Sequence, residues 1–475
     1  MNPGETPADV HARTPVASDS RRDFLLKAVA TTALSAARAN AQTGKPNIIY
    51  VHSHDSGRFL QPFGFAVPTP NLQRLAGEGV LFRRAFSAAP TCSPSRSGFL
   101  TGQCPHRNGM LGLAHRGFRL NDYNKHILHT LRPAGYHSVL AGLQHIAADP
   151  KVIGFDEILP HKSTQAADVA PGAVEFLGRA HTAPFFLDVG FFETHREYPK
   201  PGPADDPRYT LPPAPIPDTP ETRLDTAAFH ASARNMDHAV GQILDALDAH
   251  GLTGNTLVIS TTDHGVSFPL MKCNLEDDGW GVSLIMRGPG GFTGGKVIDA
   301  LISQLDIYPT LCDLAGVAHP EWLEGKSMMP VIRGEAKEIN EEVFAEVNYH
   351  AAYEPKRAVR TARWKYIRRF GDKHTPVLPN CDDGLSKTLW LNNGWKDMQL
   401  PEESLYDLIF DPHERNNLAA DPGSQKVLAE MRKRLDDWMH RTSDPLLNGP
   451  VPAPHGAQVN NPDGISPKET PERVA

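Results

Sequence analysis

The chain has 475 residues, a formal net charge of −7 and a charged fraction of 22%. This length allows about two to three domains. The sequence has no basic tract interleaved with aromatic residues, which excludes the usual surface of a nucleic-acid-binding protein. We therefore expect a globular protein of ordinary composition without a nucleic-acid partner.

The N-terminal residues have the pattern of an export signal. Residues 20–27 read Ser-Arg-Arg-Asp-Phe-Leu-Leu-Lys, and a weakly apolar run and a small-residue cleavage pattern at residues 39–41 follow. The apolar run is short and is interrupted by Arg38, which argues against a membrane anchor. We predict a twin-arginine signal over residues 1–41, export by the twin-arginine machinery, and a periplasmic or secreted protein that begins near Gln42.

The sequence contains 5 cysteines. Their spacings show neither a disulfide framework nor the Cys/His pattern of a zinc site. Because twin-arginine substrates fold before export, we assign no disulfide bridge from the sequence, although the cysteines could pair. The cysteines are Cys92, Cys104, Cys273, Cys312 and Cys381.

The first predicted strand leads to a pair of ligand-type residues. Residues 47–51 are apolar and rich in β-branched side chains, which is typical of a strand buried on both faces of a parallel sheet. His54 and Asp55 follow it closely. An open α/β sheet places its binding site at the carboxyl ends of its strands, so we predict that both residues belong to a site.

A helix with an unusual first turn comes after a predicted helix and strand over residues 70–82. Pro94 fits the first turn of a helix that starts at Cys92, and Gly102 is a typical stop. The free N–H groups at the helix start favour an anion, and Arg96 adds a bidentate donor one turn later. The segment therefore suits sulfate or phosphate; the alternative is a cysteine that is simply buried at a helix start.

Strands and helices continue to alternate along the chain, which predicts a doubly wound mixed sheet. Three further apolar runs are each followed by candidate site residues. The run over residues 137–140 is followed by His145, and the run over residues 184–192 is followed by His195. The run over residues 256–260 is followed by Asp263-His264-Gly265. Helices are predicted at residues 124–134, 227–250 and 303–314, a further strand at 282–286, and a proline-rich irregular excursion at 199–220.

From about residue 335 the pattern changes to short antiparallel strands, as at residues 359–361 and 364–367. A closing helix is predicted over residues 424–440, and the proline-rich remainder is expected to be extended. The predicted organisation is a large α/β domain over residues 42–334, a small α+β subdomain over residues 335–443 and a tail over residues 444–475.

The string Cys-x-Pro-Ser-Arg followed by Leu-Thr-Gly, over residues 92–102, resembles the signature of the type I sulfatases. In that family the cysteine is oxidised to formylglycine by a formylglycine-generating enzyme. The resemblance covers nearly the whole mature chain, and residues 108–113 resemble the heparan N-sulfatase (sulfamidase) branch in particular. It implies an alkaline-phosphatase-like doubly wound mixed sheet with a smaller C-terminal α+β subdomain.

The resemblance also implies roles for individual residues. The nucleophile is a hydroxyl of the formylglycine gem-diol, activated toward Asp263 and stabilised by a divalent metal and Arg96. Lys272 and His195 hold the sulfate and protonate the leaving group, and His145 takes the proton of the second hydroxyl so that the aldehyde returns. The implied metal ligands are His54, Asp55, Cys92, Asp263 and His264, and the residues that loosely match a substrate pocket are Glu346, Tyr349 and His350.

Two positions depart from the family pattern. His54 stands where these enzymes have the first of two adjacent metal-binding aspartates, and Leu143 stands where many have a sulfate-binding lysine. Calcium is the expected metal from the resemblance, but it prefers oxygen ligands, so histidines beside carboxylates leave manganese open.

The predicted function is hydrolysis of sulfate esters or sulfamates, chiefly those of sulfated carbohydrates. Two alternatives stay open. One is a formylglycine-dependent phosphonate or phosphate diester hydrolase, which shares the Asp-His-Gly metal motif. The other is an inactive carbohydrate-binding relative, which the departures at His54 and Leu143 would explain.

Overall fold

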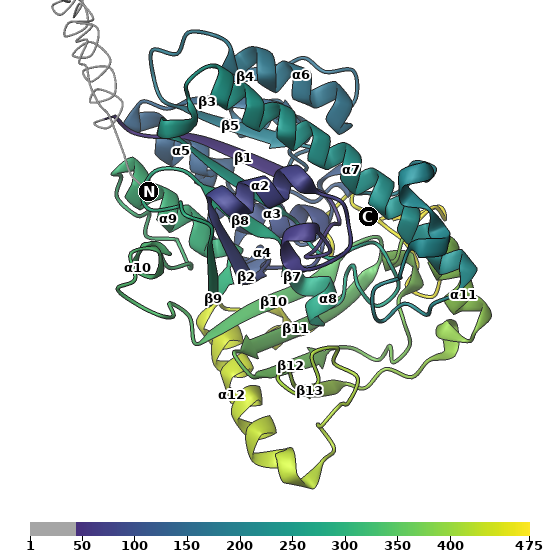
Figure 1. Ribbon diagram of the computed structural model, residues 1–475. Coiled ribbons are helices and arrows are strands. Elements are labelled where there is room, and N and C mark those ends of the chain that lie inside the picture. The colour runs from purple at the N-terminus through teal and green to yellow at the C-terminus, as the bar shows by residue number, and fades with distance from the viewer. Residues whose placement is uncertain (1–43) are drawn as a thin grey trace, which may run out of the picture. The chain divides into compact units, whose positions relative to one another are not determined.

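The structure is a computed structural model that describes residues 44–475; the predicted twin-arginine signal lies outside the described residues. Residues 45–475 form one compact unit. Its largest element is a nine-stranded mixed sheet with the order β4-β3-β5-β1-β6-β8-β2-β7, in which β9 pairs with β2 (Figure 1). The strands are β1 (Asn47–Ser53), β2 (Val80–Phe86), β3 (His137–Gly142), β4 (Glu157–Leu159), β5 (Phe185–Gly190), β6 (Thr256–Thr262), β7 (Gly281–Val282), β8 (Leu284–Arg287) and β9 (Lys296–Ser303).

Strand β1 lies at the centre because both of its faces are apolar. Ile49 and Val51 contribute to one hydrophobic cluster, whereas Ile48 and Tyr50 contribute to another on the opposite face. Successive side chains of a strand point to opposite faces, so a continuous apolar run requires a cover on each. β1 pairs in parallel with β5 and with β6.

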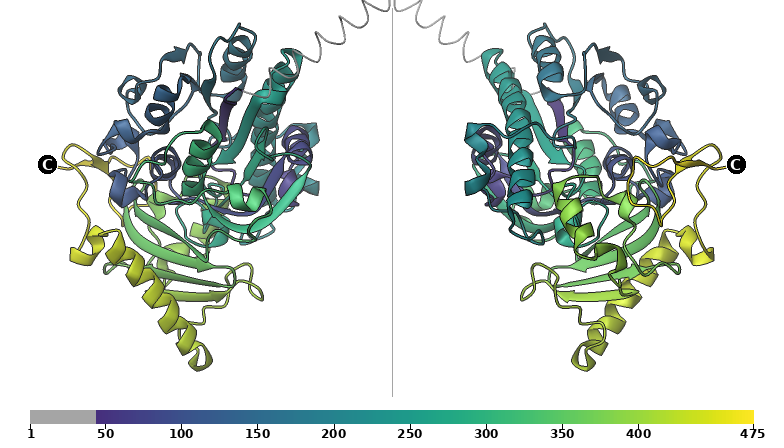
Figure 2. Two further views of the ribbon diagram at one scale, coloured as in Figure 1. Left: turned by 90° about the vertical axis from the view of Figure 1, so that its left-hand side faces the viewer. Right: turned by 90° about the vertical axis from the view of Figure 1, so that its right-hand side faces the viewer.

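Helices supply both covers, and they lie on both sides of the sheet in Figures 1 and 2. The first cluster includes residues of α2 (Pro70–Glu78), α6 (Ala166–Leu177) and α7 (Pro220–Ala249). The second includes residues of α3 (Cys92–Thr101), α5 (Ile127–Leu131) and α9 (Ile307–Ala315). This arrangement confirms the predicted doubly wound α/β fold.

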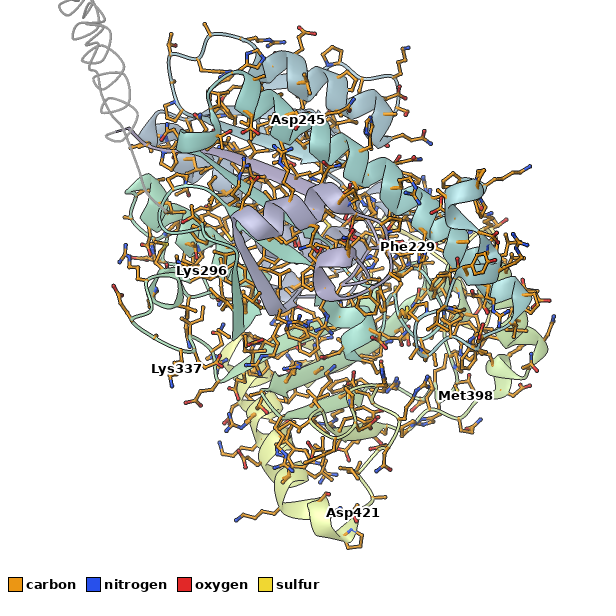
Figure 3. All side chains as sticks on the ribbon, in the orientation of Figure 1. Phe229, Asp245, Lys296, Lys337, Met398 and Asp421 are labelled. Atoms are coloured by element: carbon orange, nitrogen blue, oxygen red, sulfur yellow. The ribbon has the colours of Figure 1, made fainter. Side chains whose placement is uncertain are left out.

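The long helix α7 shows how amphipathicity sets this packing. Phe229 is buried in the first cluster, while Asp245, farther along the same helix, is exposed and pairs with Arg74 (Figure 3). The helix starts at Pro220, earlier than predicted, because Thr219 and Thr222 form a capping box at its first turn.

The helix predicted over residues 124–134 is broken into short pieces. The regular helix covers only Ile127–Leu131, with single 3₁₀ turns before and after it. His126 is extended and caps the helix through its ring nitrogen, and Pro133 lies in the turn that follows. A cap inside the predicted helix and a proline near its end divide it.

A second, four-stranded antiparallel sheet carries the C-terminal part of the chain. Its strands are β10 (Glu342–Tyr349), β11 (Tyr353–Thr361), β12 (Trp364–Arg369) and β13 (Glu403–Asp407). One face packs against α12 (Gln425–Arg441), and the other packs against residues of the large sheet such as Phe86. The short remaining elements are α4 (Pro105–Asn108), α8 (Asp277–Trp280), α10 (Met329–Ile332), α11 (Leu385–Asn392), β14 (Gln458–Val459) and β15 (Glu472–Arg473).

The last residues of the chain pack onto the rest of the unit. Beyond residue 444 regular structure is limited to one 3₁₀ turn and the short β14–β15 pair, yet Val451 and Ala457 are buried. Ala457 belongs to the second core cluster of the large sheet. Among the described helices, none is both long enough and apolar enough to cross a membrane.

A buried ion network joins the small sheet to this C-terminal segment. The guanidinium of Arg357 on β11 donates to both carboxylate oxygens of Asp444, at 2.6 and 2.9 Å, and lies 3.5 Å from Glu346. All three side chains are almost completely buried. Removing one partner of such a network leaves uncompensated charge in the interior.

We expect Arg357→Met to destabilise the protein by about 3–5 kcal/mol, because Asp444 and Glu346 would stay buried without their cation. Urea unfolding followed by circular dichroism measures the change. The control is Arg363→Met, which breaks an exposed pair with Asp407 and should shift the midpoint far less. Equal shifts in the two variants would contradict the importance given to the buried network.

Candidate active site

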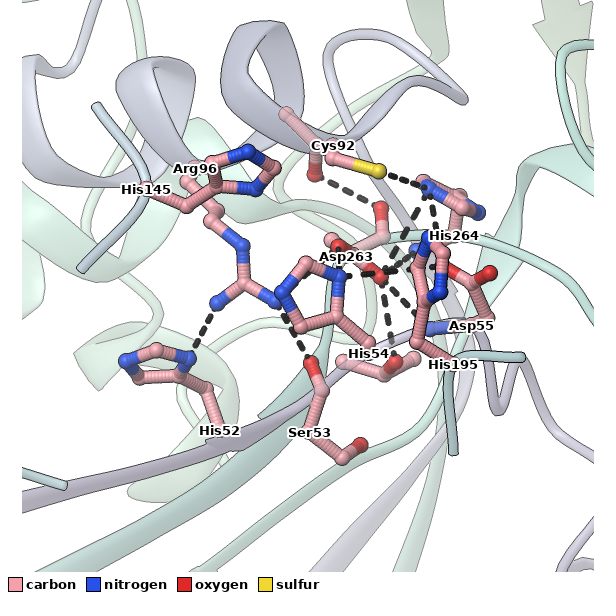
Figure 4. A network of polar contacts seen from close by, with 12 residues as sticks. His52, Ser53, His54, Asp55, Cys92, Arg96, His145, His195, Asp263 and His264 are labelled. Carbon is pink, nitrogen blue, oxygen red and sulfur yellow. Dashed lines mark hydrogen bonds and ion pairs between the residues drawn. The ribbon is translucent and has the colours of Figure 1, made fainter. Parts of the chain in front are cut away.

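The predicted site residues converge at one edge of the large sheet (Figure 4). His54 and Asp55 follow β1, and Asp263 and His264 follow β6. β3 and β5, which precede His145 and His195, run parallel to them. Parallel strands end at the same edge, so four separate segments bring their polar residues together. Cys92, at the start of α3, lies among them.

Cys92 is the first residue of α3, and the helix ends at Gly102 in the left-handed conformation, as predicted. The thiol is buried, with Sγ 3.3 Å from His264 Nε2 and 3.9 Å from His350 Nε2. Burial raises the pKa of the Cys92 thiol well above its ordinary value. The unmodified side chain is therefore a neutral thiol and not a ready thiolate nucleophile.

The buried guanidinium of Arg96 ties α3 to the ends of β1 and β6. It donates to the carbonyl oxygen of Ser53 at 2.9 Å and to Asp263 Oδ2 at 3.0 Å. A further nitrogen contacts His52 Nδ1, and the opposite nitrogen of that ring lies 2.8 Å from Asp188. Arg96 thus fixes the position of Asp263.

Several donor atoms converge next to Cys92 in a way that fits a divalent cation. His264 Nδ1–H donates to the carbonyl of Gly265 at 2.9 Å, which leaves the lone pair of Nε2 free. That nitrogen lies 3.4 Å from Asp55 Oδ1 and 3.7 Å from Asp263 Oδ1. His54 Nδ1 lies 3.1 Å from Asp263 Oδ2 and 3.8 Å from Asp55 Oδ1.

Both aspartates of this group are ionised. Burial alone raises the pKa of a carboxyl group, but nearby cations outweigh it here. Lys272 holds the pKa of Asp55 well below its usual range, and Arg96 contributes to the same shift at Asp263. The two carboxylates therefore lie beside the imidazole of His54 at one buried position, and His264 Nε2 lies 3.4 Å from Asp55.

Lys272 forms a second charged group beside the first. Its Nζ donates to Asp55 Oδ2 at 2.8 Å and to Asp382 Oδ2 at 2.7 Å, and lies 3.3 Å from His195 Nε2. Although burial lowers it, the pKa of Lys272 is raised well above its ordinary value by Asp382 and Asp55. His195 Nδ1 bonds to the carbonyl of Arg196 at 2.6 Å, so Nε2 faces Lys272.

His145 is half-buried near His54, with ring centroids 5.3 Å apart. Its Nε2 lies 3.0 Å from Nδ1 of His115, and the two rings stack at a centroid distance of 5.2 Å. Burial, His54 and His115 lower the pKa of His145 well below its ordinary value, so the neutral form of the ring is favoured. Leu143, which stands in place of the family's lysine, offers no charge here.

The backbone at the site includes unusual conformations. Asp55 has φ 49° and His145 has φ 58°, in the left-handed region that non-glycine residues seldom adopt. Such residues cluster at functional sites, where the surrounding structure supplies the energy that holds them.

The three residues matched loosely to a substrate pocket separate in space. His350 reaches the thiol of Cys92, whereas Glu346 bonds to the ring of His106 at 2.9 Å. The hydroxyl of Tyr349 donates to a backbone carbonyl of the C-terminal segment at 2.7 Å. Of these three residues, the structure therefore brings only His350 next to Cys92.

Two site residues have no signal in the sequence. Asp382 follows a buried cysteine in an irregular segment, and His115 lies in a short 3₁₀ turn. Neither follows a predicted strand. Their contacts with Lys272 and His145 bridge 110 and 30 residues of sequence, respectively.

Comparison with protein families gives two matches. The sulfatase family matches residues 46–317, and the C-terminal family of N-sulphoglucosamine sulphohydrolase matches residues 271–379. The first match alone covers more than half of the chain and contains every predicted catalytic residue.

Individual relatives agree with these matches. The chain is 30% identical to human N-sulphoglucosamine sulphohydrolase, over 81% of this chain and 88% of that protein. It is 29% identical to an ulvan-active sulfatase of Formosa agariphila, over 92% of this chain and 88% of the relative.

Solved structures show the same fold. One, from work on glycosaminoglycan metabolism by Bacteroides thetaiotaomicron, aligns with a TM-score of 0.69 and 23% identity, over 86% of this chain and 100% of the other. Another, solved with D-glucosamine-2-N,6-O-disulfate, aligns with a TM-score of 0.66 and 19% identity, over 86% and 99%. The resemblance predicted from residues 92–102 is confirmed, and the chain belongs to the sulfatase family of sulfuric ester hydrolases.

Proposed function

We propose that the chain removes sulfate from sulfated carbohydrates, as an O-sulfate ester or as a sulfamate, after Cys92 has been converted to formylglycine. The observation that carries the proposal is the position of Cys92. It starts a buried helix beside the carboxylates of Asp55 and Asp263, with Lys272 and His195 on the same side.

The proposed substrate class rests on the relatives. One relative is named for N-sulphoglucosamine, and one neighbour in structure was solved with a glucosamine that carries both N- and O-sulfate. The match of residues 271–379 to the C-terminal family of the first relative supports an N-sulfated amino sugar. The position of His350 within the match, 3.9 Å from the thiol of Cys92, supports a role in substrate binding.

The proposed reaction divides the work among the residues of this chain. Formylglycine supplies, when hydrated, a hydroxyl nucleophile that can be regenerated without a second hydrolytic step. A divalent cation would be held by His54, Asp55, Asp263 and His264 and would supply electrostatic stabilisation of negative charge. These four side chains offer the donors that such an ion requires.

The remaining residues transfer protons and hold the reacting groups in position. Asp263, ionised and fixed by Arg96, accepts the proton of the attacking hydroxyl. Lys272 and His195 hold the sulfate, and His195 passes a proton that it takes from the Lys272 ammonium to the leaving oxygen or nitrogen. Neutral His145 receives the proton of the second hydroxyl. Asp382 holds Lys272 in position from the side opposite Asp55.

We also propose the cellular route and the organisation of the chain. A formylglycine-generating enzyme modifies Cys92, and the twin-arginine machinery carries the folded protein to the periplasm or beyond. The catalytic domain spans residues 42–334, the C-terminal subdomain spans residues 335–443 and the tail spans residues 444–475. The start of β10 at Glu342 supports the second boundary.

We expect co-expression with a formylglycine-generating enzyme to convert Cys92, which removes the sulfur and changes the mass of its tryptic peptide. The converted protein should hydrolyse an aryl sulfate, and Cys92→Ala should lose this activity because no aldehyde can form. Cys312→Ala, at a buried cysteine of α9, is the matched control and should stay active. An unmodified, inactive wild type in competent cells would contradict the proposal and favour a binding protein.

We expect the converted enzyme to act on N-sulfated or O-sulfated glucosamine with a higher kcat/KM than on a phosphate diester. The reason is that a phosphate diester has only two terminal oxygens, whereas a sulfate ester or a sulfamate would offer three to Lys272 and to a bound cation. Steady-state rates on the three substrates measure the preference. A clear preference for the diester would assign the chain to the alternative suggested by the Asp263-His264-Gly265 motif.

We expect His195→Asn to slow hydrolysis of a sugar sulfate by about 10²–10⁴-fold, the usual contribution of a general acid. The loss on 4-nitrophenyl sulfate should be much smaller, because nitrophenolate leaves without a proton. His137→Asn, at an exposed histidine on β3, serves as the control. Equal losses on the two substrates would show that His195 positions the sulfate and does not donate the proton.

A further inference from the structure

The donors beside Cys92 are unusual for the calcium that the family resemblance implies. Calcium binds six to eight oxygen atoms, mostly of carboxylates and carbonyls. Here an imidazole nitrogen of His54 lies in the group with Asp55, Cys92 and Asp263, and Nε2 of His264 lies 3.4 Å from Asp55. Imidazole and thiolate are ligands of zinc and related transition ions. The donor set therefore fits a different class of ion.

The buried polar atoms of this group need an occupant. Both ring nitrogens of His54 and Oδ1 of Asp55 have no hydrogen-bond partner within the described residues. His54 is 1% exposed and Asp55 is 0% exposed. A buried donor or acceptor without a partner costs about 1–3 kcal/mol, and more when it is charged. One cation would satisfy Asp55 and one nitrogen of His54 together.

The thiol belongs to the same group of donors. One ligand atom each from His54, Asp55, Cys92 and Asp263 lie within 4.8 Å of one another. A tetrahedral zinc ion, with bonds of about 2.0–2.3 Å, separates its ligands by about 3.3–3.8 Å. The distances of 3.1 and 3.8 Å from His54 to the two aspartates already approach these values. A small inward movement of Cys92 would complete the site.

The surrounding charges favour an anionic ligand set around the ion. Arg96 lies 3.0 Å from Asp263, and Lys272 lies 2.8 Å from Asp55. Two carboxylates and a thiolate exceed the charge of a divalent ion, and the two cations offset the remainder. His264, with its free Nε2 3.3 Å from the sulfur, can replace a ligand or add a fifth.

We propose that, in chains that fold without conversion of Cys92, His54, Asp55, Cys92 and Asp263 bind zinc with Cys92 as a thiolate ligand. The sulfur–zinc bond forms as the S–H proton leaves to solvent, and no oxidation occurs. The bound ion caps the thiol and satisfies the buried donors. The inference rests on the metal position in the proposed function, but it concerns a form of the protein that has no aldehyde.

The test uses the full mature chain made without a formylglycine-generating enzyme, with Cys92 confirmed as a thiol by mass spectrometry. After chelator treatment, the protein is titrated with Co²⁺ and then with Zn²⁺. We expect one Co²⁺ per chain and a thiolate-to-cobalt charge-transfer band in the near ultraviolet, which Zn²⁺ abolishes. Ca²⁺ at the same concentration should leave the band unchanged.

Variants identify the ligands. Cys92→Ala should lose the band, and Cys312→Ala should keep it, because Cys312 lies in the core away from the site. His54→Asp should weaken Zn²⁺ binding by at least about 10-fold, because the loss of even an outer contact of a metal site lowers metal affinity by about 10- to 100-fold. Circular dichroism of each variant checks that it is folded.

The absence of the band in folded wild type, or its persistence in Cys92→Ala, would overturn the inference. Displacement of the band by Ca²⁺ would also overturn it. None of these results depends on sulfate hydrolysis, so they leave the proposed function standing. Conversely, a converted protein without sulfatase activity would not alter the cobalt spectrum of the thiol form.

Discussion

The contact of Arg96 with Asp263 and with the end of β1 is the interaction on which the site depends. It joins the helix that presents Cys92 to the two central strands that present the carboxylates. A buried guanidinium is stable only when its hydrogen bonds are made, so the contact fixes all three elements at once. Arg96, which the sequence predicted to bind an anion, forms most of its hydrogen bonds with the protein itself. A substrate can therefore bond only to a nitrogen of Arg96 that the protein does not use, such as Nε, which has no partner among the described residues.

Much of the fold was predictable because the strands of the large sheet are buried on both faces. Continuous apolar runs such as β1 and β5 predict buried strands, and the polar residues that follow them predict the position of the site. Residue spacing also predicted the limits of α3, because proline and glycine set them. The prediction of one helix over residues 124–134 was wrong, because composition does not reveal that His126 caps a shorter helix within the segment.

The site was less predictable where contacts are long-range. Asp382 and His115 sit on irregular segments, and only the folded chain brings them to Lys272 and His145. The small sheet shows the same limit, since Glu346 and Tyr349 lie on β10 and His350 directly follows it, but the three side chains point into different surroundings. Side chains alternate along a strand, so a one-residue difference decides which face each of them joins.

The burial of Cys92 sets an order of events. The residue is 1% exposed and begins a helix in which every residue is buried. A modifying enzyme cannot reach a thiol that is 1% exposed once α3 has docked on the sheet. In the proposed route, twin-arginine export requires folding in the cytoplasm, so modification has to compete with folding during or just after synthesis. On this proposal, the time that α3 takes to dock would determine what fraction of newly made chains acquires the aldehyde.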